Sequence, residues 1–358
     1  MAIPSQSRRS AGTLATRRVR LPWPKDRRFR ILAIDGGGIR GILPASILTE
    51  FERRHCGGGS IGDRFDMIAG TSTGAIIALA LAMGVPASRV LNIYMERGED
   101  IFPAPRRFRR IRHACRALAS LRRYRYDRTP LERELRTVFA DRILGEATRR
   151  VCVPSFDGFT EVNVFKTPHH PDFRRDWREE IATVALASSA APTFFSVYAN
   201  GNRRFADGGV WANNPVMIAL VDALACYELD RDQIDILSLG CGESEMVISD
   251  QQVRFGGLWH WREIISSAMH LASQNALGQA GLLIGRDRLI RLDAPVTEDP
   301  IALDDVARAK AELPHVALEL VDRFDSQVSE RFLTTVAERY AAFYGPRAEV
   351  GTADRGEE

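Results

Sequence analysis

The segment that decides the fold is FRILAIDGGGIRG, residues 29–41. Its apolar part, Phe29–Asp35, is typical of a buried β-strand that ends in a carboxylate, and a helix is expected from about Ile39 to Arg54. Glycines between a strand and a helix leave backbone N–H groups unobstructed, so this loop can bind a pyrophosphate or a transient oxyanion. A plain tight turn is an alternative. The spacing at 36–41 also fits G-x-G-x-x-G, which keeps a dinucleotide-binding loop open.

A second strand–turn–helix pattern follows at Gly70-Thr71-Ser72-Thr73-Gly74. An apolar strand, Phe65–Ala69, is expected before it and an apolar helix, Thr73–Gly84, after it. This is the G-x-S-x-G pattern of a nucleophile elbow, in which the sharp turn exposes the serine hydroxyl and needs glycine on both sides. The alternative is a Ser/Thr cap on an ordinary helix.

A third candidate is Asp207-Gly208-Gly209, which comes after the apolar pair Phe205-Ala206. An aspartate at the carboxyl end of a strand lies on the side where open α/β sheets bind ligands. Asp207 could therefore face Ser72 and act as its base, although a simple Asp-Gly turn explains the same residues.

The rest of the chain alternates expected strands and helices. This alternation predicts an α/β fold in which helices cover both faces of a mainly parallel sheet. We expect flexible tails at 1–29 and 346–358 and a single domain at 30–345, with a motif-bearing core at 30–220 and a helical C-terminal portion at 245–345. Further strands are expected at 151–154, 162–166 and 234–239, and helices at 86–98, 177–189, 215–227, 258–283, 304–323 and 328–344.

Composition narrows the function classes. The chain has 358 residues, 45% of them hydrophobic and 27% charged, which excludes a disordered chain and a disulfide-stapled mini-protein. Its five cysteines form no C-x-x-C pair, so neither a zinc site nor a disulfide framework is indicated. The longest apolar run, Ala75–Val85, is shorter than the roughly 20 residues that span a bilayer, and no signal peptide is visible. We expect an intracellular protein that meets membranes only at their surface.

Histidines give no sign of a catalytic triad or of a metal site. None of the seven stands in a triad-like context. The pair His169-His170 lies in Thr-Pro-His-His-Pro, which is typical of a loop, and no third metal ligand is indicated nearby.

The segment 106–123 is the most basic part of the chain. Apolar residues at steps of three or four predict an amphipathic helix with an arginine-rich face. It could be a solvated surface helix, a surface drawn to anionic phospholipid, or a site for a phosphorylated activator. Nucleic-acid binding is disfavoured because few aromatic residues are interleaved. The arginines concerned are Arg106, Arg107, Arg109, Arg110, Arg112, Arg116, Arg122 and Arg123.

Taken together and in this order, the glycine loop, the serine elbow and the Asp-Gly-Gly motif resemble the patatin-like phospholipase family over about residues 30–220. The resemblance implies a three-layer α/β/α fold with a central, mostly parallel sheet, and a Ser–Asp dyad in place of a triad. Ser72 would be the nucleophile and Asp207 the general base. An oxyanion hole from the N–H groups of Gly36, Gly37 and Gly38 is implied, with Arg40 helping to orient it. The remaining motif residues are the elbow glycines Gly70 and Gly74 and the glycines Gly208 and Gly209. No metal or organic cofactor is implied.

A narrower resemblance extends to about residue 345. Several short segments are similar to bacterial patatin-like effectors, which include cyclic-nucleotide-activated phospholipases of anti-phage (CBASS) signalling systems. The segments are Ile101–Pro103, Val164–Thr167, Ser188–Thr193, Trp211–Pro215, Leu237–Gly240 and Gly256–Trp259. Where the family has Gly-Thr-Gly, this chain has Gly240-Cys241-Gly242, and we expect Cys241 to be a core residue.

That narrower resemblance implies a cytoplasmic enzyme that acts on membrane phospholipid at the inner face of the cell membrane. It also implies a cyclic dinucleotide activator such as 3′,3′-cGAMP, no nucleic-acid partner, and a possible homo-oligomer. The alternatives are a constitutive patatin-like lipase, a dinucleotide-dependent oxidoreductase, and a non-catalytic module that binds membranes or nucleic acid. The oxidoreductase would leave the motifs at 70–74 and 207–209 without a role.

Overall fold

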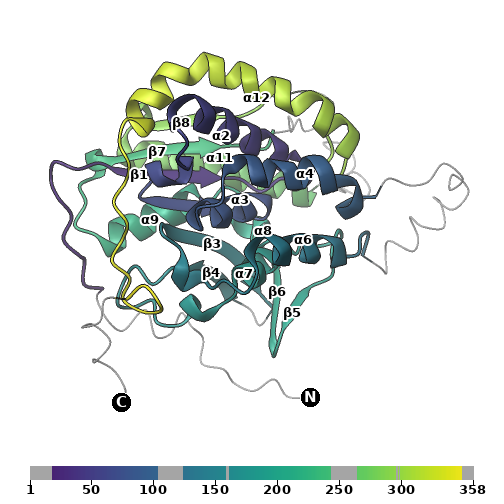
Figure 1. The fold of residues 1–358 in the computed structure, drawn as a ribbon, viewed down its shortest axis with the longest axis horizontal. Helices are drawn as coiled ribbons and strands as arrows, with labels where there is room; N and C mark the ends of the chain where they lie inside the picture. Colours follow the sequence, from purple (N-terminus) through teal and green to yellow (C-terminus); the bar gives the residue numbers. More distant parts are fainter. Residues whose placement is uncertain are drawn as a thin grey trace, which may run out of the picture.

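The computed structural model describes residues 18–103, 124–158, 161–242, 264–295, 297 and 299–348. Their centre is an eight-stranded sheet in the order β5-β6-β3-β2-β1-β7-β8, with β4 paired to β3 (Figure 1). The strands are β1 (Phe29–Ile34), β2 (Met67–Gly70), β3 (Arg150–Asp157), β4 (Glu161–Lys166), β5 (Tyr198–Asn200), β6 (Arg203–Asp207), β7 (Ile234–Leu239) and β8 (Leu289–Leu292).

The middle of the sheet is parallel. The strand pairs β1–β2, β1–β7, β2–β3 and β7–β8 are parallel, whereas β4, β5 and β6 join the β3 side in antiparallel pairs. Parallel strands are buried on both faces of the sheet, because each crossover connection between them covers one face. All six residues of β1 are accordingly buried, and the expected mostly parallel sheet is confirmed.

Helices form a layer on each face of the sheet. Leu32 and Ile34 of β1 point into one apolar layer, and Phe29, Ile31 and Ala33 point into the other, as the two-residue period of a strand requires. The first layer contains α2 (Ile42–His55), α3 (Thr73–Ala82), α4 (Ala87–Ile101), α6 (Thr129–Phe139), α7 (Ile181–Ser188) and α12 (Val306–Val328). The second contains α9 (Val216–Cys226) and α11 (Ile264–Ile284), which follow the short α8 (Gly209–Ala212).

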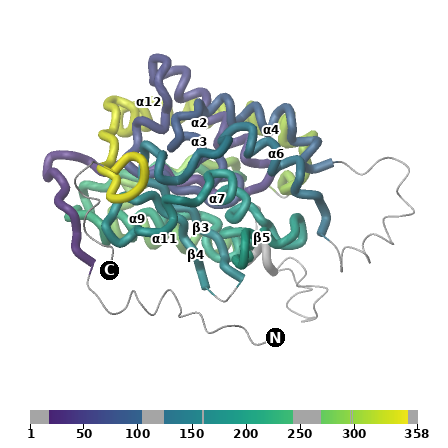
Figure 2. The backbone as a smooth tube through the Cα atoms, turned by 60° about the horizontal axis from the view of Figure 1, so that its bottom comes forward, coloured from purple at the N-terminus to yellow at the C-terminus, as the bar shows by residue number. Residues whose placement is uncertain are grey.

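The figures show how the first layer is arranged. In Figure 1, α12 arches over α2 and α4. In Figure 2, α4 lies beside α6, and α7 comes next. The result is the expected α/β/α architecture.

The prediction of a C-terminal helix at 328–344 is wrong. Helix α12 ends at Val328, a five-residue π-helix covers Ser329–Leu333, and residues 334–348 are not helical. Its backbone bonds to other segments instead: the Ala337 N–H donates to the carbonyl of Asp63, and the Phe343 N–H to that of Pro168. These tertiary hydrogen bonds replace the internal ones of a helix. Four of the helices and strands, α6, α8 (Gly209–Ala212), β5 and β8, were not expected from the sequence.

Part of the expected N-terminal tail is packed. Trp23 is buried and its ring lies 4.8 Å from that of Phe29. The Leu21 N–H donates to the carbonyl of Cys226 at the end of α9. The packed chain therefore begins before Arg30. At the other end, the Arg347 guanidinium donates to the carbonyl of Ala147.

Two expectations stay predictions: the arginine-rich helix and the bounds of the single domain. The arginine-rich helix at 106–123 lies outside the described residues. The extent of the single domain, 30–345, stays a prediction. Across the described part of the chain, no helix combines the length and the apolar character needed to cross a membrane.

Candidate active site

Ser72 sits in a strained turn between β2 and α3. Its φ of 55° and ψ of −119° are rare for a residue with a side chain. A Cβ on Gly70 would lie 2.1 Å from the Gly74 carbonyl oxygen, and one on Gly74 would lie 2.2 Å from that of Ile34. Only glycine fits at either position. The turn is therefore sharp enough to expose the side chain of Ser72. Strain of this kind is concentrated at functional sites.

Ser72 is hydrogen-bonded to Asp207. The serine Oγ lies 2.6 Å from Asp207 Oδ2, and Oδ1 of the same carboxylate accepts the Gly209 N–H at 2.6 Å. Asp207 is buried, and burial raises its pKa to about 6, although both hydrogen bonds act in the opposite direction. The carboxyl group is therefore a stronger base than an ordinary aspartate and still ionises near neutral pH.

Asp207 reaches this edge of the sheet by a route that the sequence did not reveal. Strand β6 is antiparallel to β3, and Asp207 pairs with Ser155, beyond the parallel part of β3. The rule for parallel strands thus gave the correct edge, but the strand that carries Asp207 runs in the opposite direction. A Cβ on Gly208 would lie 2.3 Å from the Pro154 carbonyl oxygen, which explains why glycine follows the aspartate.

The glycine loop lies directly against the elbow. A Cβ on Gly36 would be 3.2 Å from the Cβ of Ser72. The loop continues into a 3₁₀ turn at Gly38–Gly41, and α2 begins at Ile42, three residues later than expected. The Gly36 N–H donates to the Asn213 carbonyl at 3.1 Å and the Ile39 N–H to that of Leu303 at 2.9 Å. Within the described residues, the N–H groups of Gly37 and Gly38 have no protein acceptor.

Ser188 supports the elbow from α7. Its Oγ accepts the Ser72 N–H at 3.0 Å and donates to the Pro154 carbonyl at 2.7 Å. The hydroxyl therefore ties Ser72 to β3, the strand that β6 and Asp207 join. The segment Ser188–Thr193 was indicated only by the family resemblance, because a lone serine in a helix carries no signal of this contact.

A cleft of about 600 Å³ opens at Ser72 and Asp207. Polar groups, among them Arg40 and Asn213, line the part next to the glycine loop. The part between α4, α6 and the 191–195 segment is mostly apolar, with Arg125 and Thr193 as polar members of the lining. Its apolar side chains are Ile76, Ile101, Phe102, Leu131, Phe194 and Phe195. The cleft thus has the two-part lining expected for a substrate with an apolar chain and a polar end.

Asp304 fixes one wall of the apolar part. Its Oδ2 accepts from Tyr126 Oη at 2.7 Å and from Arg125 Nη1 at 2.6 Å. The Tyr126 ring in turn lies 5.4 Å from that of Phe102. The carbonyl of the neighbouring residue, Leu303, accepts the Ile39 N–H of the glycine loop. The segment just before α12 therefore contacts both the glycine loop and the wall that contains Tyr126.

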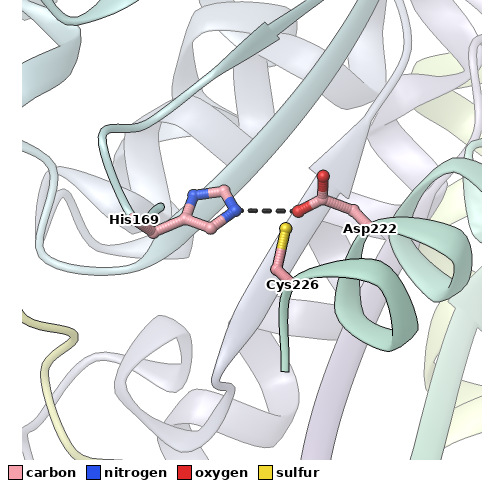
Figure 3. A group of neighbouring side chains, drawn as sticks. All are labelled: His169, Asp222 and Cys226. Carbon is pink, nitrogen blue, oxygen red and sulfur yellow. Dashed lines mark hydrogen bonds and ion pairs between the residues drawn. The ribbon is translucent and has the colours of Figure 1, made fainter. Parts of the chain in front are cut away.

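Of the expected loop pair of histidines, His169 is part of a buried polar cluster on the face of the sheet that α9 covers, whereas His170 Nε2 hydrogen-bonds to the Val19 carbonyl at 2.8 Å. His169 Nε2 lies 2.8 Å from Asp222 Oδ2, with Cys226 beside them (Figure 3). Two further groups within reach of His169 are thus present that the sequence did not indicate. The Lys166 ammonium, however, already pairs with Asp222. Although burial raises the pKa of Asp222, Lys166 and His169 lower it well below its usual range. The cluster is therefore a charge-balanced link between β4 and α9.

Cys241 is the buried thiol that was expected. Its Sγ donates to the Asp35 carbonyl at 3.3 Å, and burial raises its pKa far above the ordinary value. A Cβ on Gly37 would lie 2.3 Å from the Cβ of Cys241, so this residue backs the glycine loop.

Comparison with known proteins defines the class. Residues 32–220 match the family described as patatin-like phospholipase. The cGAMP-activated phospholipase of Escherichia coli (strain TW11681) is 33% identical over 78% of this chain and 85% of its own length. The enzyme of the same name from Vibrio cholerae serotype O1 is 36% identical over 71% of this chain and 76% of its own. The chain belongs to the patatin-like phospholipase family and is therefore a hydrolase of the phospholipase class.

Likeness to a solved structure is weaker. VipD from Legionella pneumophila aligns over 83% of this chain and 67% of its own with 12% identity and a TM-score of 0.37. The family assignment rests on the sequence matches alone.

Proposed function

We propose that Ser72 and Asp207 form a Ser–Asp dyad that hydrolyses acyl esters of membrane phospholipids. The observation that carries the proposal is the 2.6 Å hydrogen bond between Ser72 Oγ and a buried carboxylate whose pKa is raised to about 6. A base of this strength, held within hydrogen-bond reach, can take the serine proton at neutral pH.

The reaction runs in two halves. Ser72 Oγ attacks the ester carbonyl as its proton moves to Asp207 Oδ2, and the tetrahedral intermediate collapses when Asp207 returns that proton to the leaving alcohol. Asp207 then deprotonates a water molecule that attacks the acyl-enzyme carbonyl, and it returns this proton to the departing Ser72 Oγ as the fatty acid is released.

The glycine loop stabilises the oxyanion in both halves. We assign the donors to the Gly37 and Gly38 N–H groups, because the Gly36 N–H already donates to Asn213. Gly36 then serves as the point of close approach to Ser72, and Arg40 orients the loop from its far end. Donors fixed in this way account for about 10²–10³ in kcat in other acyl-transfer enzymes.

We infer from the two parts of the cleft how the two ends of the substrate bind. The fatty-acyl chain lies in the apolar part between α4 and α6, and the headgroup side faces Arg40 and Asn213. Extraction of the lipid takes place at the membrane surface, at the cytoplasmic face of the cell membrane.

The direct test compares Ser72→Ala and Asp207→Asn with the wild type on phospholipid vesicles. Fatty-acid release should fall by at least about 10³ in both variants while the folded state persists. Lys166→Arg, in the buried cluster on the other side of the sheet, is the matched control and should keep the wild-type rate. Substantial hydrolysis by Ser72→Ala would assign the chemistry to another residue.

We also propose that a cyclic dinucleotide such as 3′,3′-cGAMP activates the enzyme in antiviral defence. The support is the name that the bacterial relatives carry, and the need to restrain a phospholipase inside its own cell. A shift from 1% to 99% active requires the activator to bind the active state with about 5.5 kcal/mol of preference, and assembly into a homo-oligomer can supply part of this coupling. Hydrolysis titrated with cyclic di- and trinucleotides should rise sharply with one of them. Full activity without any nucleotide would leave a constitutive lipase.

A further inference from the structure

A ring of hydrogen bonds holds both ends of the glycine loop from behind. Asp35 directly precedes the glycines, and its Oδ2 accepts from Arg291 Nη2 at 2.8 Å. Arg291 lies on β8, and the same Nη2 donates to Asp293 Oδ2 at 2.7 Å. Its Nη1 donates to the hydroxyl of Ser238 on β7 at 2.9 Å. One guanidinium therefore joins the start of the loop to two strands of the sheet.

The ring closes through Asp293. Asp293 Oδ1 accepts the Gly242 N–H at 2.7 Å, and the Gly242 carbonyl accepts from Arg40 Nη1 at 2.8 Å. Arg40 lies at the far end of the loop, and its N–H donates to the Gly37 carbonyl at 3.1 Å. The path thus runs from Asp35 through Arg291, Asp293 and Gly242 to Arg40, and back into the loop.

The ring is shielded from water. The side chains of Asp35, Arg291 and Asp293 are 4%, 17% and 14% exposed. Charge-assisted hydrogen bonds are stronger in such surroundings than at the surface. The glycines themselves have no side chains with which to hold their position, so the geometry of the loop depends on what fixes its two ends.

We propose that Arg291 is a positioning residue for the oxyanion hole. It touches neither the substrate nor Ser72, and acts through Asp35, Asp293 and Arg40 on the direction of the Gly37 and Gly38 N–H groups. The planar guanidinium bonds two carboxylates and a hydroxyl at once, and the single ammonium of a lysine cannot reproduce this geometry. The inference rests on the proposed function, since it concerns the same oxyanion hole.

The test is Arg291→Lys, measured on a soluble short-chain ester in the full-length protein. We expect kcat to fall at least tenfold and KM to stay within threefold, because the oxyanion donors act mainly in the transition state. The pH midpoint of activity should not move, because Asp207 is untouched. Rates are normalised to the amount of Ser72 that a fluorophosphonate labels at the end point, which counts only competent enzyme.

Arg149→Lys is the matched control. Arg149 is even more buried than Arg291, at 2% exposed, and pairs with Asp63 at 2.6 Å, but it lies before the amino end of β3, at the opposite edge of the sheet from Ser72. It should lower the melting temperature and leave kcat unchanged. If Arg291→Lys does not fold, Asp293→Asn replaces it, because the amide oxygen can still accept the Gly242 N–H while the charge that holds Arg291 is lost. Its kcat should fall at least threefold.

The outcomes separate the two proposals. A wild type that hydrolyses the ester but is not labelled at Ser72 would refute the proposed function. A labelled wild type whose Arg291 and Asp293 variants keep the normalised kcat would refute the positioning role alone. The same holds if their kcat loss is no larger than that of Arg149→Lys.

Discussion

Replacing Asp207 by asparagine should stabilise the protein while it abolishes activity. Burial raises the pKa of this carboxyl group to about 6, from an ordinary value of 3.8. A folded-state pKa above the unfolded one means that ionisation costs stability, and this cost appears as the pH rises from about 4 to about 6 and is complete above that range. Two pKa units correspond to about 3 kcal/mol at pH 8. Asparagine keeps the shape and removes the charge.

Urea unfolding at several pH values measures this effect. Relative to the wild type, Asp207→Asn should gain about 2 kcal/mol between pH 4 and pH 8. Its rate of ester hydrolysis should fall by about 10³–10⁴, because an amide cannot take the serine proton. In the wild type, activity should rise with pH through a midpoint near 6, since the carboxylate is the active form. A stability difference that does not change with pH would refute the raised pKa, and retained activity would refute the role of base.

Three further predictions concern packing around the site and behind the sheet. Gly74→Ala places a Cβ 2.2 Å from the Ile34 carbonyl oxygen and should destabilise the fold by about 3 kcal/mol or more in thermal melts. The control Gly278→Ala, whose Cβ would meet no atom within 4 Å, should be neutral or stabilising. Phe195→Ala should enlarge the apolar part of the cleft and shift the preferred acyl length upward on a series of p-nitrophenyl esters; an unchanged profile would place the chain elsewhere. Lys166→Met leaves the buried Asp222 carboxylate without its cation and should cost about 3–5 kcal/mol in urea unfolding, while a loss below about 1 kcal/mol would show that His169 suffices.

Local patterns predicted the centre of the fold well. The apolar run before Asp35 and the five residues from Gly70 to Gly74 gave β1 and the elbow, because a strand, a glycine turn and a helix each have a signature within a few residues. Asp207 was placed at the correct edge of the sheet. The antiparallel direction of its strand could not be predicted, because strand pairing is decided by contacts far apart in sequence.

The features that the sequence did not predict depend on contacts between residues far apart in the chain. Arg291 lies 256 positions from its partner Asp35, and Ser188 lies 116 positions from Ser72. No short motif contains either pair. The segment 334–344 has the composition of a helix, but hydrogen bonds from residues such as Ala337 to Asp63 hold it in another conformation. The two groups near His169, Asp222 and Cys226, were missed for the same reason, since both lie on α9, a different element.

The measurement that tests the central claim most directly is the site of covalent modification by a fluorophosphonate. The wild type, digested and analysed by mass spectrometry after loss of activity, should carry one adduct on Ser72. Modification should slow in Asp207→Asn and disappear in Ser72→Ala, because the attack needs both the hydroxyl and its base. An adduct on any other serine that accompanies the loss of activity would contradict the Ser72–Asp207 dyad.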